Sequence, residues 1–323
     1  MNIVKIPADY PVCKTIYIRS SLIESVAGPY QKSDILASAD VQNYYSSIWW
    51  VDIVPKNLKE NEYPHVRPDD MRNAKNGESA SDVAKLALAD LEKTLQQHQG
   101  NIAALILEPL VQCATGMAMY DAEYLRLARS LCDCYEVHLI ADEIMTGFGR
   151  TGTFFAHEQA EVVPDFLCLS KGITGGYLPL SVVMTTDAIY AAFYDDSVTR
   201  GFLHSHSYTG NALACRAALA TLDIFETENV IGANRQTSAK ITAACEAIAR
   251  HPRVRNFRQH GMIWAFEVDT DDPTFARNFH QRALEKELLL RPIGNTVYFM
   301  PPYVITDEEI AQLTRGTREL LDS

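Results

Sequence analysis

Residues 137–171, VHLIADEIMTGFGRTGTFFAHEQAEVVPDFLCLSK, contain two short and mostly apolar runs, each of which ends at polar or charged residues. The first run, 137–141, is followed by Asp142, and the second, 166–169, is followed by Ser170 and Lys171. Runs of this length between polar segments are typical of strands that are buried on both faces. We therefore expect two buried strands with Asp142 and Lys171 at their carboxyl ends.

Helical and strand patterns continue on both sides of this stretch. A helix is expected to begin at Ser79 or Ser81 and to end at Gly100. Its apolar face comprises Val83, Leu86, Ala87, Leu91 and Leu95. Further strands are expected at 102–107 and 180–185, with a helix over 121–135 that Asp121 caps. Strands that alternate with helices predict a mostly parallel sheet flanked by helices.

The order of expected helices and strands changes after Gly210, where we expect a smaller α+β domain. The pattern predicts helices at 211–226, 234–250 and 273–287, strands at 262–268 and 296–300, and a last helix that Thr306 caps with Glu309 as its capping-box partner. The 323 residues then divide into an N-terminal segment of 1–60 with no clear period, a large domain of 61–225 and a small domain of 226–323.

Charge and cysteine content exclude some functional classes and indicate a cellular setting for this protein. Lys plus Arg is 29 and Asp plus Glu is 41, which gives a formal charge of −12 and argues against nucleic-acid or anionic-membrane binding. The N-terminus lacks the apolar core of a signal peptide, and no apolar run is long enough to span a bilayer. Seven dispersed cysteines favour a reducing, cytoplasmic setting. Cys132 and Cys134 lack a second Cys/His pair at zinc spacing, so no metal site is expected.

A glycine pattern, GFGRTG at 147–152, matches the dinucleotide-binding motif GxGxxG. In a Rossmann fold that loop follows its strand directly and opens a helix, whereas five residues separate this pattern from the strand. The ribose-binding carboxylate should also end the next strand, which here ends in Ser170 and Lys171. The spacing therefore argues against a dinucleotide site.

An acid and an amine at two strand ends favour a different cofactor. Asp142 and Lys171 are about one crossover unit apart, and ligands of open α/β sheets bind where strands end. A lysine between a buried strand and a glycine-rich turn is expected to be buried, and burial favours the uncharged amine that attacks carbonyls. Pyridoxal phosphate needs a lysine for its aldehyde and an acid at its ring nitrogen. A structural salt bridge is the alternative.

Three longer motifs carry a resemblance to a known family. They are LIADEIMTGFGRTG at 139–152, CLSKGITGG at 168–176 and HSHSYTGNALAC at 204–215. Together they resemble the class III pyridoxal-phosphate aminotransferases, a resemblance that covers about residues 60–323. It implies the type I fold of pyridoxal-phosphate-dependent transferases. Two further stretches, GGYLPL at 175–180 and RPIGNTVYFMPPY at 291–303, resemble the biotin-pathway members. Those enzymes pass an amino group from S-adenosylmethionine to 8-amino-7-oxononanoate, giving 7,8-diaminononanoate.

The resemblance assigns a role to each candidate residue. Lys171 would form the Schiff base with the cofactor and act as the catalytic base, while Asp142 would pair with the pyridine nitrogen. Ser207 would contact the cofactor phosphate of a neighbouring subunit, which implies a homodimer. Arg291 would bind the carboxylate of the substrate. Nearby residues that would also line the substrate site are Tyr298, Arg150 and Glu108. Each also has a structural interpretation, such as an ion pair, a turn or a helix cap.

The match fails at the N-terminus. The family has a Gly/Ser phosphate-binding turn and an aromatic residue that stacks on the pyridoxal ring, and residues 1–60 contain neither pattern. Trp49 and Trp50 could stack on a ring, but packing is the better interpretation. Two alternatives therefore stay open. The chain could be another class III aminotransferase that acts on ω-amino acids or diamines, or a truncated and non-catalytic relative that binds a partner chain.

Overall fold

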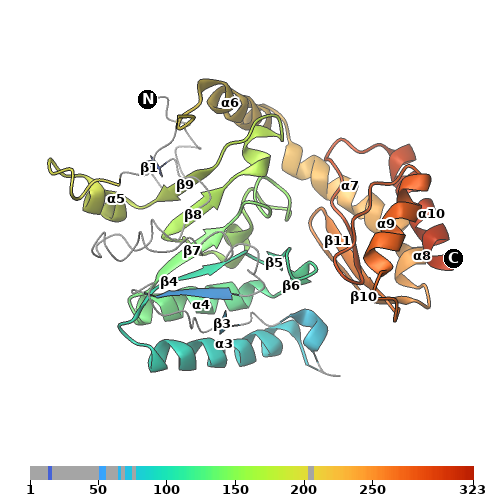
Figure 1. Ribbon diagram of the computed structural model, residues 1–323, viewed down its shortest axis with the longest axis horizontal. Coiled ribbons are helices and arrows are strands. Elements are labelled where there is room, and N and C mark those ends of the chain that lie inside the picture. Colours follow the sequence, from blue (N-terminus) through green and yellow to red (C-terminus); the bar gives the residue numbers. More distant parts are fainter. Residues whose placement is uncertain (1–13, 17–50, 56–64, 67–69, 75–77, 203–206) are drawn as a thin grey trace.

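The computed structural model describes residues 14–16, 51–55, 65–66, 70–74, 78–202 and 207–323. Most of the N-terminal segment 1–60, with Trp49 and Trp50, lies outside these residues, as do His204 and His206 of the third motif. Within them, one seven-stranded sheet has the order β1-β9-β8-β7-β4-β2-β3 (Figure 1). The strands are β1 Lys14–Ile16, β2 Val51–Pro55, β3 His65–Val66, β4 Ile102–Leu107, β7 His138–Asp142, β8 Phe166–Leu169 and β9 Val182–Thr185.

Strand direction confirms a mostly parallel sheet with one correction. The central strands β4, β7 and β8 pair in parallel, whereas β9 pairs antiparallel with β8, β1 with β9, β2 with β4 and β3 with β2. Five of the seven strands therefore share one direction, and only β2 and β9 oppose it. The expectation that β9 continues the parallel series is wrong. The chain between β8 and β9 carries only the short 3-10 helix η4 Lys171–Thr174, and a parallel return needs a full crossover.

Helices α3 Ala80–Gln97 and α4 Ala122–Cys134 cover one face of this sheet, as expected (Figure 1). Ser79 caps α3 in a capping box with Asp82, and Asp121 caps α4. Leu86, expected on the apolar face of α3, is instead 61% exposed, and Leu88 is buried. The helix advances about 100° per residue, so Leu86 lies about 140° around the axis from buried Leu91.

Both faces of the central strands are buried. On β4, Leu105 and Leu107 pack with α3 and α4, whereas Ala104 and Ile106 pack in a second cluster on the opposite face. That second cluster also holds Val183 of β9 and, at its edge, Ile189 of α5 Asp187–Phe193. Burial on both sides explains why these strands have continuous apolar sequences rather than alternating ones.

The C-terminal part forms a three-stranded antiparallel sheet between two cores. Its strands are β10 Val254–His260, β11 Ile263–Val268 and β12 Thr296–Phe299, and its helices are α7 Val230–Ala244, α8 Glu246–Ala249, α9 Phe275–Glu285 and α10 Asp307–Asp322. On β11, Trp264 and Phe266 face the core under these helices, while Ile263 and Ala265 pack against the core of α3 and α4. The sequence did not predict β10 and placed the start of α7 four residues late. The domain boundary at 225 stays a prediction.

The helix α6 Ala212–Thr227 leads from the large sheet to α7 (Figure 1). No helix in the part of the chain that the structure describes is both long and apolar enough to cross a bilayer.

Candidate active site

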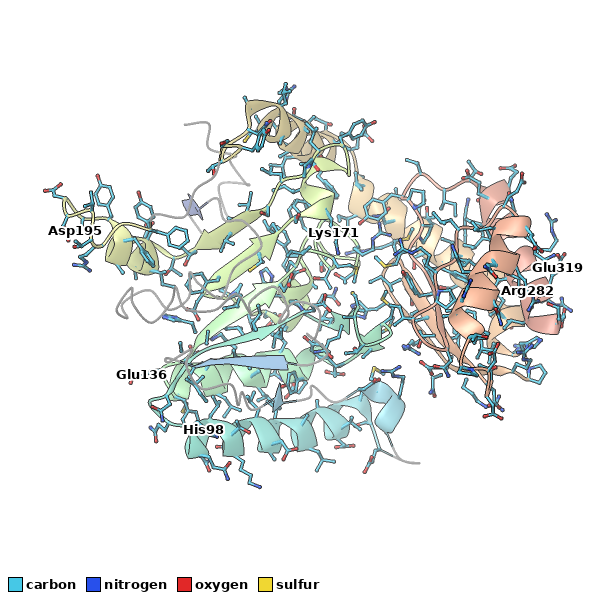
Figure 2. All side chains as sticks on the ribbon, viewed as in Figure 1. His98, Glu136, Lys171, Asp195, Arg282 and Glu319 are labelled. Atoms are coloured by element: carbon cyan, nitrogen blue, oxygen red, sulfur yellow. The ribbon has the colours of Figure 1, made fainter. Side chains whose placement is uncertain are left out.

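Three neighbouring parallel strands bring Glu108, Asp142 and Lys171 together. The register pairs Leu107 with Ala141 and Asp142 with Cys168, so the residues at or just beyond the carboxyl ends of β4, β7 and β8 meet at one edge of the sheet. The charge of Lys171 acts on both carboxyl groups, and the carboxylate of Asp142 acts on Glu108. Lys171 lies at the sheet end nearer the C-terminal part of the chain (Figure 2). The expected crevice residues are therefore close in space.

Lys171 occupies an unusual backbone position at the start of η4. Its φ of +45° lies in the left-handed region, which a residue with a side chain rarely adopts outside constrained sites. The preceding Ser170 is held by its Oγ, which donates to the Leu180 carbonyl oxygen at 2.7 Å. The side chain of Lys171 is exposed, so the expectation of a buried lysine is wrong. Lys171 lies beyond the last residue of β8, past the cover that neighbouring strands provide.

Asp142 is half-buried at the end of β7. Its Oδ1 accepts a hydrogen bond from the Ile144 backbone N–H at 3.1 Å, and Oδ2 has no hydrogen bond to any described residue. Burial and the neighbouring Glu143 carboxylate raise the pKa of Asp142 to about 6, although the Ile144 N–H and Lys171 oppose this shift. A cationic partner at Oδ2 would favour the charged carboxylate.

Glu108 follows β4 and faces the same cluster. Its Oε2 accepts a hydrogen bond from the Cys113 backbone N–H at 2.6 Å. Burial, together with the Asp142 carboxylate, raises the pKa of Glu108 to about 8, against the effects of the Cys113 N–H and Lys171. Cys113 itself is half-buried beside these charges, and burial raises the pKa of its thiol. Sequence reasoning missed Cys113, whose only signal was its place five residues after Glu108.

A buried polar cluster lies next to Asp142 and was also missed. The Glu143 side chain is fully buried, and its Oε1 accepts a hydrogen bond from the His157 backbone N–H at 2.8 Å and lies 3.0 Å from His157 Nδ1. Its Oε2 accepts a hydrogen bond from Thr146 Oγ1 at 2.6 Å. These contacts anchor the loop after β7 and fix the backbone that carries Asp142. The acidic doublet at 142–143 was the available signal.

Arg150 contacts the segment after β12 rather than the Lys171 cluster. Its Nη1 donates to the Pro301 carbonyl oxygen at 2.8 Å, and the guanidinium lies 4.5 Å from the centre of the Tyr303 ring. Tyr303 in turn donates its hydroxyl to the Phe148 carbonyl oxygen at 2.7 Å. Burial lowers the pKa of Arg150. Its predicted place beside the substrate stays a prediction.

The other three candidates lie on surfaces or at the domain junction. Arg291 is exposed between α9 and β12 and makes no ion pair with any described residue. Tyr298 is half-buried on β12, on the face that packs against the core of α3 and α4. Ser207 is exposed in the turn that precedes α6. Among the residues that the structure describes, no group of three His, Cys, Asp or Glu side chains is arranged to hold a metal ion.

A protein-family comparison matches the aminotransferase class III model to residues 51–321, which includes every strand-end residue of the site. The chain belongs to the class III aminotransferase family. Members of this family depend on pyridoxal phosphate. Most of the predicted fold is confirmed by this match, and the roles of single residues stay predictions.

Several curated relatives of this class III chain share a name. The adenosylmethionine-8-amino-7-oxononanoate aminotransferase of Helicobacter pylori is 50% identical over 243 residues, which is 73% of this chain and 56% of that protein. The enzyme of the same name from Synechococcus elongatus is 40% identical over 241 residues, with 73% and 56% covered. The chain thus spans little more than half the length of the curated relatives it matches.

Solved structures agree with the class III fold. The adenosylmethionine-8-amino-7-oxononanoate aminotransferase of Methanocaldococcus jannaschii superposes with a TM-score of 0.69 at 34% identity, covering 73% of this chain and 57% of that one. An omega transaminase from Pseudomonas jessenii in complex with PMP superposes with a TM-score of 0.80 at 22% identity, covering 98% and 76%. The latter likeness concerns the fold alone.

Proposed function

We propose that this chain binds pyridoxal phosphate at the ends of β4, β7 and β8 and acts as the aminotransferase of the biotin pathway. The observation that carries the proposal is the meeting of an exposed amine, Lys171, with the carboxyl groups of Asp142 and Glu108 at one sheet edge. The family match and the relatives at up to 50% identity support it.

The donor set at this edge fits the cofactor. Bound pyridoxal phosphate withdraws electrons from the substrate carbon that carries the amino group, so that a proton can leave that carbon. The exposed Nζ of Lys171 would bind the aldehyde carbon and later move that proton. Oδ2 of Asp142, which has no hydrogen bond within the described residues, would accept a hydrogen bond from the protonated ring nitrogen, a cation that favours the charged carboxylate. Ser207 of a neighbouring subunit would bind the phosphate.

The proposed substrates are S-adenosylmethionine as amino donor and 8-amino-7-oxononanoate as acceptor. Arg291 is exposed and has no ion pair within the described residues, so its planar guanidinium can bind the carboxylate of the acceptor in a bidentate manner. Tyr298 and Glu108 would line the same substrate site. Glu108, which burial keeps protonated near neutral pH, would offer a hydrogen-bond donor rather than a second negative charge.

A second copy of this chain is the proposed partner, as the role of Ser207 requires. Large apolar side chains are exposed on α6 and on the turns beside it, a surface that a dimer would bury. These residues are Tyr177, Leu178, Tyr208, Leu213 and Ile224. Light scattering at micromolar concentration should give the mass of two chains, and the mass of one chain would contradict this part of the proposal.

The decisive experiment is a borohydride reduction of the cofactor-loaded protein. Peptide mass spectrometry should find the pyridoxyl group on Lys171, and Lys171→Ala should abolish both this adduct and the visible absorbance of the bound cofactor. Lys240→Ala, which removes an exposed lysine paired with Asp307, is the matched control and should change neither. An unmodified Lys171 after loading would overturn the proposed site.

Turnover assays separate the alternative functions. Formation of 7,8-diaminononanoate from S-adenosylmethionine and 8-amino-7-oxononanoate supports the proposal. Faster turnover with simple ω-amino acids or diamines would identify another class III activity. A loaded protein that turns over neither set would favour a non-catalytic relative that binds a partner chain.

A further inference from the structure

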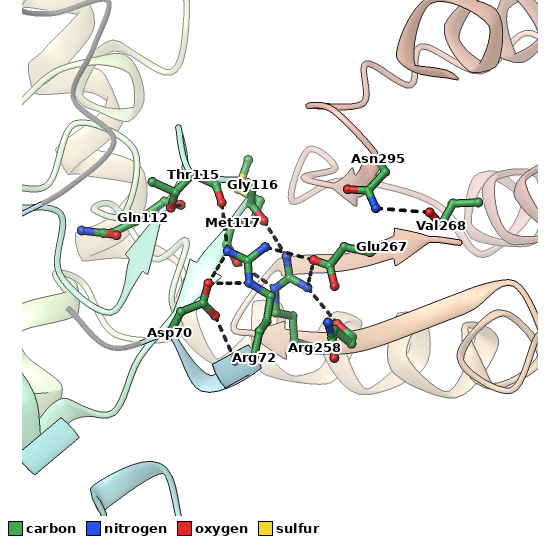
Figure 3. A network of polar contacts seen from close by, with 11 residues as sticks. Asp70, Arg72, Gln112, Thr115, Gly116, Met117, Arg258, Glu267, Val268 and Asn295 are labelled. Carbon is green, nitrogen blue, oxygen red and sulfur yellow. Dashed lines mark hydrogen bonds and ion pairs between the residues drawn. The ribbon is translucent and has the colours of Figure 1, made fainter. Parts of the chain in front are cut away.

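A polar network joins the C-terminal sheet to the turn beside Glu108 (Figure 3). Arg258 of β10 donates through Nε to the Met117 carbonyl oxygen at 2.9 Å and through Nη2 to the Gly116 carbonyl oxygen at 2.5 Å. Its Nη1 lies 2.7 Å from Oε1 of Glu267 on β11. Arg72 contacts the same Oε1 at 3.1 Å and donates to the Thr115 carbonyl oxygen at 3.1 Å.

The turn that these arginines hold has few contacts of its own: Thr115 Oγ1 donates to the Gln112 carbonyl oxygen at 3.1 Å, and Met117 is buried in the core of α3 and α4. It connects β5 Val111–Gln112 and β6 Ala118–Met119, a hairpin of only two residue pairs, and such short hairpins are weak in isolation. Gly116 and Met117 both have positive φ, which directs successive carbonyl groups outward toward the guanidinium groups. The external donors of Arg258 and Arg72 therefore add to these contacts in fixing the shape of this turn.

The same turn positions the carboxyl group of Glu108. The Met117 backbone N–H donates to the Cys113 carbonyl oxygen at 3.3 Å, and the Cys113 N–H donates to Glu108 Oε2 at 2.6 Å. A continuous chain of hydrogen bonds thus runs from Arg258 through the turn to Glu108. The side chain of Arg258 is only 10% exposed and that of Glu267 only 12%, so these contacts have weak competition from water.

We propose that Arg258 is a positioning residue for Glu108, because it helps to fix the turn 113–117 whose Cys113 N–H holds the Glu108 carboxyl group beside Asp142 and Lys171. The proposal rests on the proposed function of that cluster. It gives the C-terminal sheet a direct influence on the substrate site, since a shift of β10 would move the turn and then Glu108. The rest of the network, Arg72 and Glu267, orients Arg258.

The first test measures the turn without cofactor or turnover. The alkylation rate of Cys113 by iodoacetamide is followed by mass spectrometry, with the exposed Cys134 of α4 as internal reference. Arg258→Met should raise the ratio of Cys113 to Cys134 labelling by about fivefold, because the half-buried thiol becomes accessible when the turn opens. Arg255 lies on the same strand, but its exposed guanidinium pairs with Asp269 and not with the turn. Arg255→Met should therefore leave the labelling ratio unchanged.

The second test asks whether the effect on catalysis passes through Glu108. In cofactor-loaded protein, Arg258→Met and Glu108→Gln should each change kcat or the pH profile of kcat/KM, and the double variant should be no worse than Glu108→Gln alone. Additive losses would assign Arg258 a role in stability only. If Arg258→Met fails to fold, Arg258→Lys replaces it. The lysine keeps a positive charge near Glu267 but cannot contact Glu267, Gly116 and Met117 at once, so Cys113 labelling should rise above the wild-type rate by less than about fivefold.

Two outcomes overturn the inference. One is Cys113 labelling in folded Arg258 variants that equals the wild-type rate, and the other is additivity in the double variant. A wild-type protein without turnover would count against the proposed function instead, because the labelling test would still report on the turn.

Discussion

Gly261 lies against the backbone of Thr151, and a Cβ atom on Gly261 would come within 2.4 Å of the Thr151 carbonyl carbon. Gly261 belongs to the turn between β10 and β11, and its neighbour Met262 donates its N–H to the Arg150 carbonyl oxygen at 2.8 Å. Backbone from the loop after β7 therefore touches backbone of the C-terminal sheet. This contact needs a residue without a side chain.

Gly261→Ala should destabilise the protein strongly. Gly261 has φ +56°, and the added methyl group would also overlap the Arg150 and Thr151 backbone, so we expect a loss of about 3 kcal/mol or more. Gly294→Ala is the matched control, with φ +59° and no atom within 4 Å of the new methyl group, and it should cost about 1 kcal/mol. Urea unfolding measures both variants, and equal losses would contradict the close approach.

Asp165 should support stability in a pH-dependent manner. Burial alone would raise its pKa, but the His138 ring, whose Nδ1 lies 3.8 Å from Oδ2, and hydrogen bonds from Arg129 and the Leu139 N–H lower the pKa of Asp165 to about 2 from 3.8. A lowered pKa contributes stability above pH 4 that is lost as the pH falls toward 2. Asp165→Asn should therefore cost about 2 kcal/mol at neutral pH, and the difference from wild type should shrink between about pH 4 and pH 2.

Asp133 provides the control for Asp165, because both carboxylates contact Arg129. Asp133 contacts Arg129 Nη2 at 2.6 Å but is 67% exposed, so Asp133→Asn should cost less than about 1 kcal/mol. Chemical denaturation across this pH range checks both variants. A loss for Asp165→Asn that does not depend on pH would contradict the linkage.

Glu108→Gln should change the pH dependence of stability in the direction opposite to that of Asp165→Asn. In the protein without cofactor, burial raises the pKa of Glu108 from 4.5 to about 8, so the unfolded chain releases this proton at lower pH than the folded one. Wild-type stability should fall from this cause as the pH rises from about 4.5 to about 8. The neutral glutamine avoids this loss, and the variant should gain relative to wild type across the same range. Parallel curves would contradict the shift.

Glu143→Gln tests the buried cluster beside Asp142. An amide has an acceptor oxygen on one side only, so either the His157 N–H or the Thr146 O–H loses its acceptor in a fully buried site. We expect a loss of about 3 kcal/mol in thermal or urea unfolding. Glu161→Gln, at an exposed position after the 3-10 helix η3 Ala156–Ala160, should change stability by less than about 0.5 kcal/mol. Equal stability of both variants would show that the cluster contributes little.

Local chemistry in the sequence determined most element positions. Ser79, Asp121 and Thr306 cap helices where expected, because a cap depends on residues only two or three positions away. The buried strands at 102–107 and 166–169 follow from their own apolar runs. The placement of Asp142 and Lys171 at two strand ends followed from the same local patterns, and it led to the predicted cofactor.

Contacts between distant residues decided the rest. The antiparallel course of β9, the exposure of Lys171 and the attachment of Arg150 to Pro301 depend on how separate segments pack, which no local period encodes. Cys113 and Glu143 became site residues only when neighbouring strands brought their loops to one edge. The sequence by itself thus determined which residues end the strands and which chemistry they favour. Tertiary packing determined which of them meet, because burial and hydrogen bonds between remote segments exist only in the folded chain.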